Sequence, residues 1–345
     1  MELSTGRLEL HEIQEAFIKL GTLFENVICP GDVEFEELIL KAYRKNPWYS
    51  RENVHHAFLA WSRALKEDKI NQWLDKYRDQ LSTERTSKKI GVINAGNIPL
   101  VGFHDFLSIL ISGHSYQGKN ASDDPYLLPY ATEQLIRIEP RLKERISFTD
   151  KLNGFDAVIA TGSNNSARYF EYYFGKYPHI IRMNRNAVAV LTGEEKDDEL
   201  QKLGLDIFQY FGLGCRNVSK VFIPSDFDIK KIFPPLEFFQ EVSKHNKYMN
   251  NHDYINAMYL LKEIPFLDNG FLIVKEDEAI ASPVSVLYYE FYDTPESLKQ
   301  KLKSEQEKIQ CVVGKNFIPF GKAQQPELWD YADGVDTMEF LSKIE

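Results

Sequence analysis

The sequence contains little cysteine: Cys29, Cys215 and Cys311 are the only three in 345 residues. An odd, widely spaced set of three thiols is unlike the disulfide framework of a small secreted protein, so it fits a reducing compartment. The opening residues 1–7 also lack the apolar core of a secretory signal peptide. We therefore expect a cytoplasmic protein.

Long apolar runs and clustered positive charge are missing as well. The most apolar stretch, Ile98 to Ile111, contains His104 and Asp105 and is too short to span a bilayer. The formal net charge is −10, and no run of Lys and Arg marks a surface for nucleic acid or anionic lipid. These absences argue against a membrane span and against a nucleic-acid partner.

Several short motifs with known chemistry are also absent. The chain has no GxGxxG fingerprint, no Walker A loop and no GxSxG nucleophile elbow. HExxH, CxxC and EF-hand patterns are missing, so we expect no metal site. What remains is an ordinary globular composition, 43% hydrophobic and 27% charged. The length favours roughly two domains.

The spacing of apolar residues changes along the chain. Residues 9–82 have helical spacing, and Ser50 followed by Glu52 is typical of a helix start. From residue 90 onward, short apolar runs alternate with helical stretches, which predicts parallel βαβ units and an α/β fold. Strands are expected at 90–95, 115–119, 155–160 and 217–223, among others.

One cysteine stands in a chemically suggestive position. Cys215 comes directly after Gly212 and Gly214 and just before a predicted strand. Glycines let the backbone turn sharply and let a substrate approach closely. Arg216 and Lys220 are expected to place positive charge near the sulfur and to favour the thiolate. Two interpretations stay open here: Cys215 is a nucleophile, or it is an inert core cysteine.

Three further stretches carry polar residues near predicted strand ends. Thr161-Gly162-Ser163 precedes a helix, whose first amides bind phosphate, although such residues are also common as a helix cap. Asn97 either caps a helix that Pro99 begins and that runs to about residue 112, or aims its amide at a developing oxyanion. Lys119 either contacts a bound ribose or phosphate or is a solvated strand-end lysine.

Taken together, these stretches resemble the aldehyde dehydrogenase superfamily and, within it, the acyl-CoA reductase branch of LuxC-type fatty-acid reductases. The family's Asn-x-Pro loop, strand-end lysine, Thr-Gly-Ser turn, Gly-x-x-Cys-x-x-x-Ser-Arg stretch and Pro-Phe-Gly-Gly loop are matched in the right order. The matching residues are Asn97-Ile98-Pro99, Lys119, Thr161-Gly162-Ser163, Gly212 to Cys215 with Ser219-Lys220, and Pro319-Phe320-Gly321-Lys322. The stretch from Gly162 to Phe170 resembles the LuxC-type branch in particular.

The resemblance implies an aldehyde-dehydrogenase-like α/β fold in four segments. These are a helical N-terminal region at 1–85, a Rossmann-type nucleotide-binding domain at 86–192, a catalytic α/β domain at 193–315, and a tail at 316–345 that returns to the cofactor domain. The resemblance also assigns the site. It makes Cys215 the nucleophile and Asn97 the oxyanion donor, with Lys119, Ser122, Thr161, Gly162 and Ser163 at the cofactor.

Departures from the family pattern indicate more narrowly which reaction and which cofactor to expect. Hydrolytic members carry a water-activating Glu in the region that corresponds to 180–192, where this chain has no carboxylate. Without that base, the acyl-enzyme should pass to hydride or to CoA rather than to water. Ser122 stands where NAD-preferring members carry a ribose-binding Glu, which favours NADPH, with NADH as the alternative. The family has a second Glu that binds the nicotinamide ribose, and Glu278 lies one position away from where that Glu would fall in this chain.

The resemblance therefore implies reduction of a long-chain acyl-CoA, or another acyl thioester, to the aldehyde through an acyl-enzyme on Cys215. Two alternatives stay open. One is a partner-dependent acyltransferase that receives its acyl group from an acyl-protein synthetase in a fatty-acid reductase complex. The other is a non-catalytic dehydrogenase-like scaffold. Because members of the superfamily commonly form dimers or tetramers, we also expect a homo-oligomer.

Overall fold

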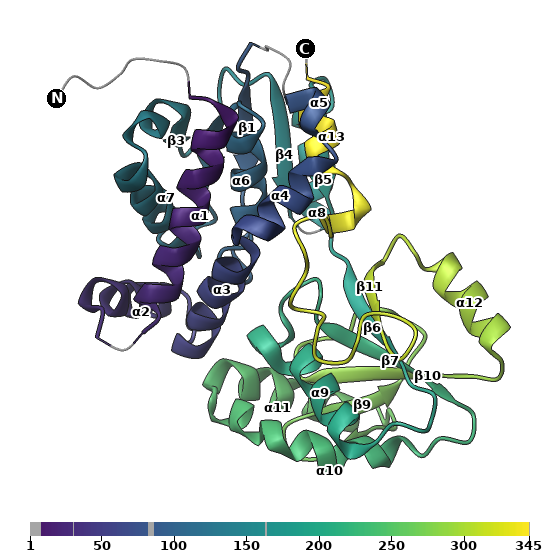
Figure 1. Ribbon diagram of the computed structural model, residues 1–345. Coiled ribbons are helices and arrows are strands. Elements are labelled where there is room, and N and C mark those ends of the chain that lie inside the picture. The colour runs from purple at the N-terminus through teal and green to yellow at the C-terminus, as the bar shows by residue number, and fades with distance from the viewer. Residues whose placement is uncertain (1–7, 30, 82–85, 163, 345) are drawn as a thin grey trace. The chain divides into compact units, whose positions relative to one another are not determined.

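The computed structural model describes residues 8–29, 31–81, 86–162 and 164–344 (Figure 1). The chain divides into two compact units: unit 1 is Met1–Met183 with Glu327–Glu345, and unit 2 is Asn184–Pro326. Both units are α/β, as the sequence predicts. The boundaries expected at 85, 192 and 315 differ from this division, and the roles assigned to those segments stay predictions.

Unit 1 is built around a parallel sheet with the strand order β3-β2-β1-β4-β5. Its register sets Ile93 of β1 opposite Lys119 of β2 and Ala160 of β4. Because parallel strands end at one edge, the segments that follow β1, β2 and β4 emerge together, where open α/β sheets bind ligands. The strands are β1 (Lys89–Ile93), β2 (Ser115–Lys119), β3 (Ile146–Phe148), β4 (Ala157–Thr161) and β5 (His179–Arg182).

Helices from the N-terminal region and from the βαβ units form the core of unit 1. α1 buries an apolar stripe, and its Phe17 meets Phe103 and Phe106 of α6 edge-on, with ring centroids 6.4 and 6.2 Å apart. Ser50 caps α3 by accepting from the backbone N–H of Asn53 at 3.3 Å, which confirms the predicted helix start. The helices are α1 (Leu10–Val27), α2 (Val33–Lys45), α3 (Arg51–Ala64), α4 (Glu67–Asp75), α5 (Arg78–Leu81), α6 (Phe103–Ile111), α7 (Leu127–Ile138), α8 (Asn164–Phe174) and α13 (Thr337–Ser342).

A buried ion pair ties three elements of unit 1 together. The guanidinium of Arg182, at the end of β5, binds both carboxylate oxygens of Asp105 on α6 at 2.5 and 2.8 Å. It also donates to Thr337 Oγ1 on α13 at 3.0 Å. Both charged side chains are buried, so loss of either partner would leave an uncompensated charge in the core. The pair therefore fixes the C-terminal helix of the chain to the sheet of unit 1.

Unit 2 contains a second sheet with the order β11-β6-β7-β10-β9-β8, parallel except for the β8–β9 pair. Its strands are β6 (Asn186–Val190), β7 (Val218–Pro224), β8 (Leu267–Asp268), β9 (Ile273–Glu276), β10 (Val286–Tyr292) and β11 (Ile309–Val313). The helices are α9 (Asp197–Phe208), α10 (Phe233–Leu236), α11 (Asn246–Leu261) and α12 (Pro295–Ser304). Thr294 caps α12 and Pro295 begins it, a pairing that is typical of a helix start.

The helix expected to open at Asn97 begins later, at Phe103. Residues 97–102 form bends and turns instead. Leu100 has a φ of 57°, a left-handed backbone conformation that a right-handed α-helix does not contain. The prediction of a helix from Asn97 is therefore wrong, and Asn97 stands on a loop between β1 and α6.

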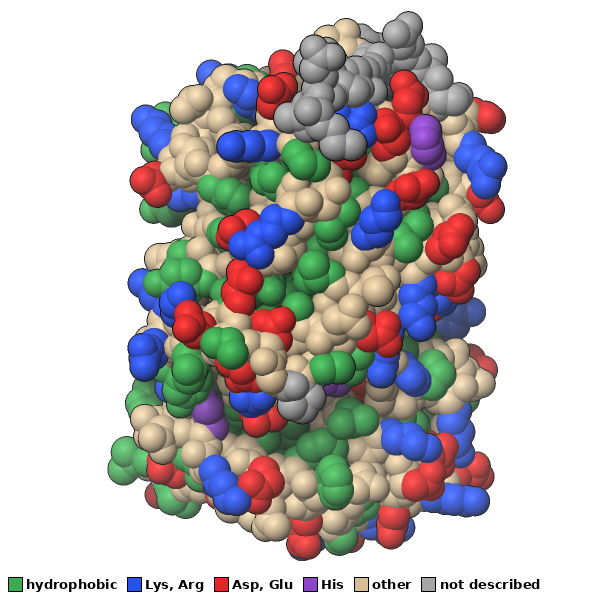
Figure 2. Space-filling view, turned by 60° about the vertical axis from the view of Figure 1, so that its left-hand side comes forward, with side chains coloured by type: hydrophobic (Ala, Val, Ile, Leu, Met, Phe, Trp, Pro, Cys, Tyr) green, Lys and Arg blue, Asp and Glu red, His purple; other side chains and the backbone are tan. Residues whose placement is uncertain are grey.

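Figure 2 shows one face of the molecule, on which Lys and Arg side chains are interspersed with Asp and Glu. Within the described ranges, no helix combines the length and apolar character needed to cross a membrane. The His, Cys, Asp and Glu side chains of the described residues also form no group of three or more that could hold a metal ion.

Candidate active site

The residues predicted to hold a cofactor gather at one edge of unit 1. Lys119 ends β2 with an exposed side chain, and Thr161 ends β4 on the other side of β1. Asn97 follows β1 between them, and its side chain is exposed. Ser122 is exposed in the turn that follows β2. Ser163 lies outside the described residues.

Gly162 joins β4 to α8 through close packing. A Cβ at this position would lie 2.8 Å from the ring of Phe170 and 3.0 Å from Cβ of Ser166, both on α8. A larger residue would therefore push the strand end away from the helix. The glycine keeps the end of β4 against the first turns of α8.

The loop that carries Asn97 is held on both sides of that residue. The side-chain amide of Asn46 donates to the carbonyl of Gly96 at 3.2 Å, and the hydroxyl of Tyr49 donates to the carbonyl of Ile98 at 3.1 Å. Asn46 and Tyr49 are both buried. The two carbonyls that flank Asn97 are therefore bound by the α2–α3 connection, while the side chain of Asn97 stays exposed.

Behind this loop lies a buried carboxylate. Asp124 is 8% exposed and accepts from the N–H of Leu127, the first residue of α7, at 3.1 Å. Burial raises the pKa of Asp124 to about 6, although hydrogen bonding to the carboxylate opposes the rise. Burial also raises the pKa of Tyr49 well above its ordinary value, so its hydroxyl keeps its proton.

In unit 2, Cys215 stands on a turn reached through an unusual backbone. Tyr210, Phe211 and Gly212 are three consecutive residues with positive φ, at 52°, 56° and 77°. Only the glycine adopts this region without cost, so the two aromatic residues carry backbone strain of about 1–3 kcal/mol each. Cys215 follows, half-buried, and β7 begins three residues later. Strain of this kind clusters at functional sites.

Asn217 fastens the Cys215 turn to the end of α9. Its side-chain oxygen accepts from the N–H of Gly214 at 2.8 Å. Its side-chain nitrogen donates to the carbonyls of Asp206, Ile207 and Gln209, at 3.1, 3.3 and 2.8 Å. Asn217 is 1% exposed, so these bonds form away from water and hold the turn in one geometry.

A second clamp joins the same turn to the 319–322 loop that matches the family's Pro-Phe-Gly-Gly pattern. Asp206 of α9 is 1% exposed and accepts from the N–H groups of Gly321 at 2.6 Å and Ala323 at 2.9 Å. Arg216 donates through Nε to the carbonyl of Ala323. Burial raises the pKa of Asp206 to about 6, although both amides and the charge of Arg216 oppose that rise. The residue after Cys215 is thereby held by a loop about 100 residues later.

Lys220 does not have the role that the sequence led us to expect. Its side chain is fully buried on β7, and its ammonium group binds the carboxylate of Glu290 and the carbonyl of Glu278, the latter at 2.9 Å. Its charge is therefore engaged by Glu290 rather than offered to the Cys215 sulfur. Glu278 contributes its backbone carbonyl to this contact. Of the two cations expected beside the thiol, only Arg216 stands next to Cys215 in the chain.

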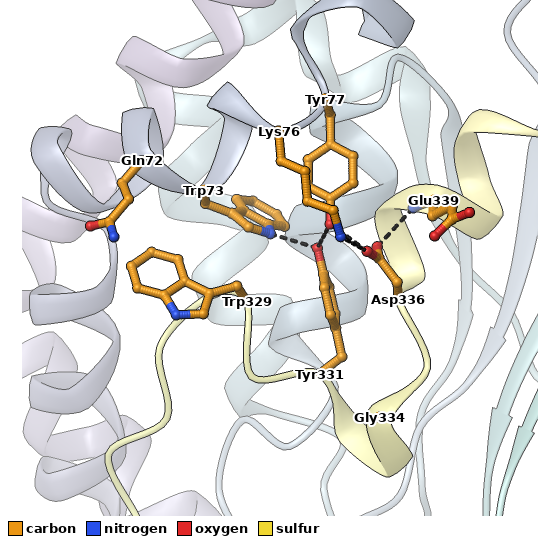
Figure 3. A pocket seen from close by; sticks show the side chains of 9 residues that line it. All are labelled: Gln72, Trp73, Lys76, Tyr77, Trp329, Tyr331, Gly334, Asp336 and Glu339. Carbon is orange, nitrogen blue, oxygen red and sulfur yellow. Dashed lines mark hydrogen bonds and ion pairs between the residues drawn. The ribbon is translucent and has the colours of Figure 1, made fainter.

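A cavity of about 580 Å³ in unit 1 lies apart from the predicted residues (Figure 3). Tyr331 is one of the residues that line it; its hydroxyl accepts from Trp73 Nε1–H at 2.7 Å and is hydrogen-bonded to the hydroxyl of Tyr77 at 2.8 Å. Asp336 accepts from Tyr77 at 2.6 Å and from Lys76 at 2.7 Å. These side chains satisfy one another, and the network attaches the segment before α13 to α4.

Solved structures of other proteins share this architecture. No protein-family model matches the chain, and no curated protein matches its sequence. Aldehyde dehydrogenase 21 from Physcomitrella patens, in complex with the reaction product succinate, superposes with a TM-score of 0.64 at 15% identity, over 89% of this chain and 74% of that one. An NAD+ complex of an aldehyde dehydrogenase from Bacillus cereus gives 0.61 at 13% identity, over 90% and 73%. A Mycobacterium tuberculosis aldehyde dehydrogenase with NAD+ gives 0.60 at 14%, over 85% and 71%.

The two units, each built on a largely parallel sheet, define a protein of the α/β class. The solved structures narrow this class: the chain has the aldehyde dehydrogenase fold. Identities of this size show the fold alone.

The described residues at the edge of unit 1 fit a nucleotide. Lys119 and Thr161 offer an ammonium and a hydroxyl at neighbouring strand ends, which suits phosphate and ribose oxygens. Gly162 lets the end of β4 pack closely against Ser166 and Phe170 of α8, and glycines serve such close packing at nucleotide sites in other α/β proteins. The roles of the residues that bind the backbone around Asn97 and Cys215 were not predicted from the sequence. The one local signal was Asn217, which stands two positions after Cys215.

Proposed function

We propose that the chain reduces an acyl thioester, with a long-chain acyl-CoA as the expected substrate, to the corresponding aldehyde. The observation that carries this proposal is the Cys215 turn: a half-buried thiol on a strained backbone, clamped through Asn217 and Arg216. In a fold shared with aldehyde dehydrogenases, such a turn supports a nucleophile better than an inert core cysteine.

In the proposed reaction, the thiolate of Cys215 attacks the thioester carbonyl. A tetrahedral oxyanion forms, and the side-chain N–H of Asn97 with the backbone N–H of Cys215 stabilise its charge. The C–S bond to CoA then breaks, the CoA thiolate leaves, and an acyl-enzyme remains on Cys215.

A reduced nicotinamide, NADPH by preference, would supply the hydride that converts the acyl group to a thiohemiacetal. Lys119, Ser122, Thr161, Gly162 and Ser163 are the residues proposed to bind this cofactor. Collapse of the thiohemiacetal releases the aldehyde and returns the electron pair to the sulfur of Cys215. The absence of carboxylates in 180–192 supports slow loss of the acyl-enzyme to water.

The test follows NADPH oxidation with a long-chain acyl-CoA, using wild-type protein and Cys215→Ser. We expect oxidation by the wild type and at least a thousandfold less by the variant, on the order of the loss seen when a nucleophile is removed. NADH and shorter acyl groups in the same assay settle cofactor and chain length. Equal oxidation by both proteins would overturn the proposal. Acylation of Cys215 without NADPH oxidation would favour the partner-dependent acyltransferase.

A further inference from the structure

The strained bend at residues 210–212, which leads to Cys215, is contacted by the start of α11. We propose that His245 is a positioning residue, whose imidazole ring braces Phe211 and thereby keeps the Cys215 turn in place. The inference rests on the proposed function only for the chemical role of Cys215. The brace itself is a property of unit 2 and is measured without any reaction.

The contact between His245 and the bend is a stack of two rings. The centroids of the His245 and Phe211 rings lie 4.2 Å apart, with 30° between the ring planes. A third ring, that of Tyr248, lies 6.2 Å from Phe211 at 45°. Aromatic pairs at such distances attract each other beyond the burial of their area. The stack therefore holds the side chain of Phe211, whose backbone φ of 56° would otherwise relax.

The position of His245 is fixed by the helix that it caps. Its Nδ1 accepts from the backbone N–H of Tyr248 at 3.3 Å, and its carbonyl accepts from the N–H of Met249 at 3.1 Å. One side chain thus caps α11 through the ring edge and contacts Phe211 through the ring face. The orientation of the ring is therefore set by α11 and not by the bend.

The helix α11 is itself fastened within unit 2. His252 is 4% exposed and is hydrogen-bonded through Nε2 to Asp268 Oδ1 at 2.9 Å. The side-chain amide of Asn256 donates to Asp268 Oδ2 at 2.6 Å. Asp268 ends the short strand β8. The helix that carries His245 is therefore attached to an edge strand of the sheet and gives the bend a fixed support.

Short-range hydrogen bonds connect the bend to the Cys215 turn. The N–H of Leu213 donates to the carbonyl of Tyr210 at 3.1 Å. Beyond the cysteine, Asn217 attaches the segment to the end of α9. His245 supports the segment before the cysteine, so the thiol lies between two attachments. Loss of the ring would let the bend relax and would loosen the turn on that side.

Two substitutions of His245 separate the stack from the cap. His245→Asn removes the ring but keeps a side-chain oxygen of the kind that caps helices well. His245→Phe keeps an aromatic ring against Phe211 but has no acceptor for the N–H of Tyr248. Because His245 is half-buried, neither change leaves a large buried cavity, and both variants should fold.

The measurement is hydrogen exchange of the full chain, followed at the segments 210–217 and 248–251. In His245→Asn, exchange of 210–217 should be about 3- to 10-fold faster, as for loss of one aromatic pair, with wild-type exchange at 248–251. His245→Phe should give the reverse pattern. Exchange of 248–251 should be about 3- to 10-fold faster, as for loss of a helix cap, with wild-type exchange at 210–217.

Tyr248→Phe is the matched control. The Tyr248 hydroxyl is buried and has no hydrogen-bond partner among the described residues, while the ring and the backbone N–H remain in the variant. Both segments should keep wild-type exchange. The brace is refuted if His245→Asn exchanges like the wild type at 210–217, if both His245 variants loosen that segment equally, or if Tyr248→Phe loosens it to the same extent.

Steady-state rates keep the brace and the reductase proposal distinguishable. In an active enzyme, His245→Asn should lower kcat by about 3- to 10-fold, and His245→Phe should keep the wild-type kcat. KM for NADPH should change little, because the residues proposed to bind NADPH belong to unit 1. An inactive wild type with the expected exchange pattern would refute the proposed reaction and leave the brace intact. Wild-type kcat in His245→Asn with faster exchange at 210–217 would refute the link to catalysis.

Discussion

The loop that carries Asn97 and the turn that carries Cys215 are held by different kinds of side chain. Each has a buried aspartate behind it, Asp124 or Asp206, with a pKa raised by burial to about 6. Asp206 faces two backbone N–H groups within 2.9 Å and the charge of Arg216, so donors are plentiful. At the Asn97 loop the donors are two neutral side chains, Asn46 and Tyr49, which bind the carbonyls of Gly96 and Ile98.

The difference between the two sites lies in charge. The Cys215 turn and the 319–323 loop are tied to α9 by Asn217 and by the side chains of Asp206 and Arg216. The two side chains that bind the backbone around Asn97, Asn46 and Tyr49, are neutral. We therefore expect pH to act on the Cys215 turn through Asp206.

Removal of the Asn97 side chain should have the largest effect on this pair of loops. In Asn97→Ala the bonds from Asn46 and Tyr49 to the neighbouring backbone are unaffected, so the fold and the loop should stay intact. Turnover should fall by about two orders of magnitude, as for loss of one oxyanion donor. Initial rates with thermal unfolding measure both quantities.

The control for this variant is Asn153→Ala, at an exposed asparagine elsewhere in unit 1. It should keep wild-type rates. Wild-type rates in Asn97→Ala would show that Asn97 does not stabilise the oxyanion, and the Asn97 loop would then have no role in the reaction.

The sequence predicted the fold class, the strands that carry the site and the strand-end position of Lys119, because alternating apolar runs and turn residues are local signals. It also singled out Cys215 through its flanking glycines. The predicted helix start at Asn97 was wrong, because Leu100 adopts a left-handed backbone conformation that a leucine in the sequence does not indicate. Tyr49 and Asn46 were missed, since they lie about 50 residues before the loop they bind.

The buried charge of Asp206 should have a smaller effect, visible in stability. Its pKa is about 6 in the folded chain and ordinary in the unfolded chain, so the folded state binds the proton more tightly. The protonated Asp206 carboxyl therefore stabilises the folded state. This stabilisation is fully present below the ordinary aspartate pKa and is lost as pH rises through about 6. Between about pH 4 and pH 7 the wild type should lose on the order of 2 kcal/mol relative to Asp206→Asn.

Urea unfolding of both proteins across this range measures the difference in slope. Asp198→Asn is the matched control, because Asp198 stands on the same helix α9 with a side chain that is 64% exposed. Its stability should follow the wild-type pH dependence. Parallel curves for Asp206→Asn and the wild type would mean that Asp206 is not held in the protonation-sensitive state described here.

The most direct measurement of the central claim is the intact mass of the protein after brief mixing with a long-chain acyl-CoA and no nicotinamide. We expect one acyl adduct on the wild type, on Cys29→Ser and on Cys311→Ser, and none on Cys215→Ser. Peptide mapping should place the adduct on Cys215. An unmodified wild type, or an adduct that survives in Cys215→Ser, would contradict an acyl-enzyme at this residue.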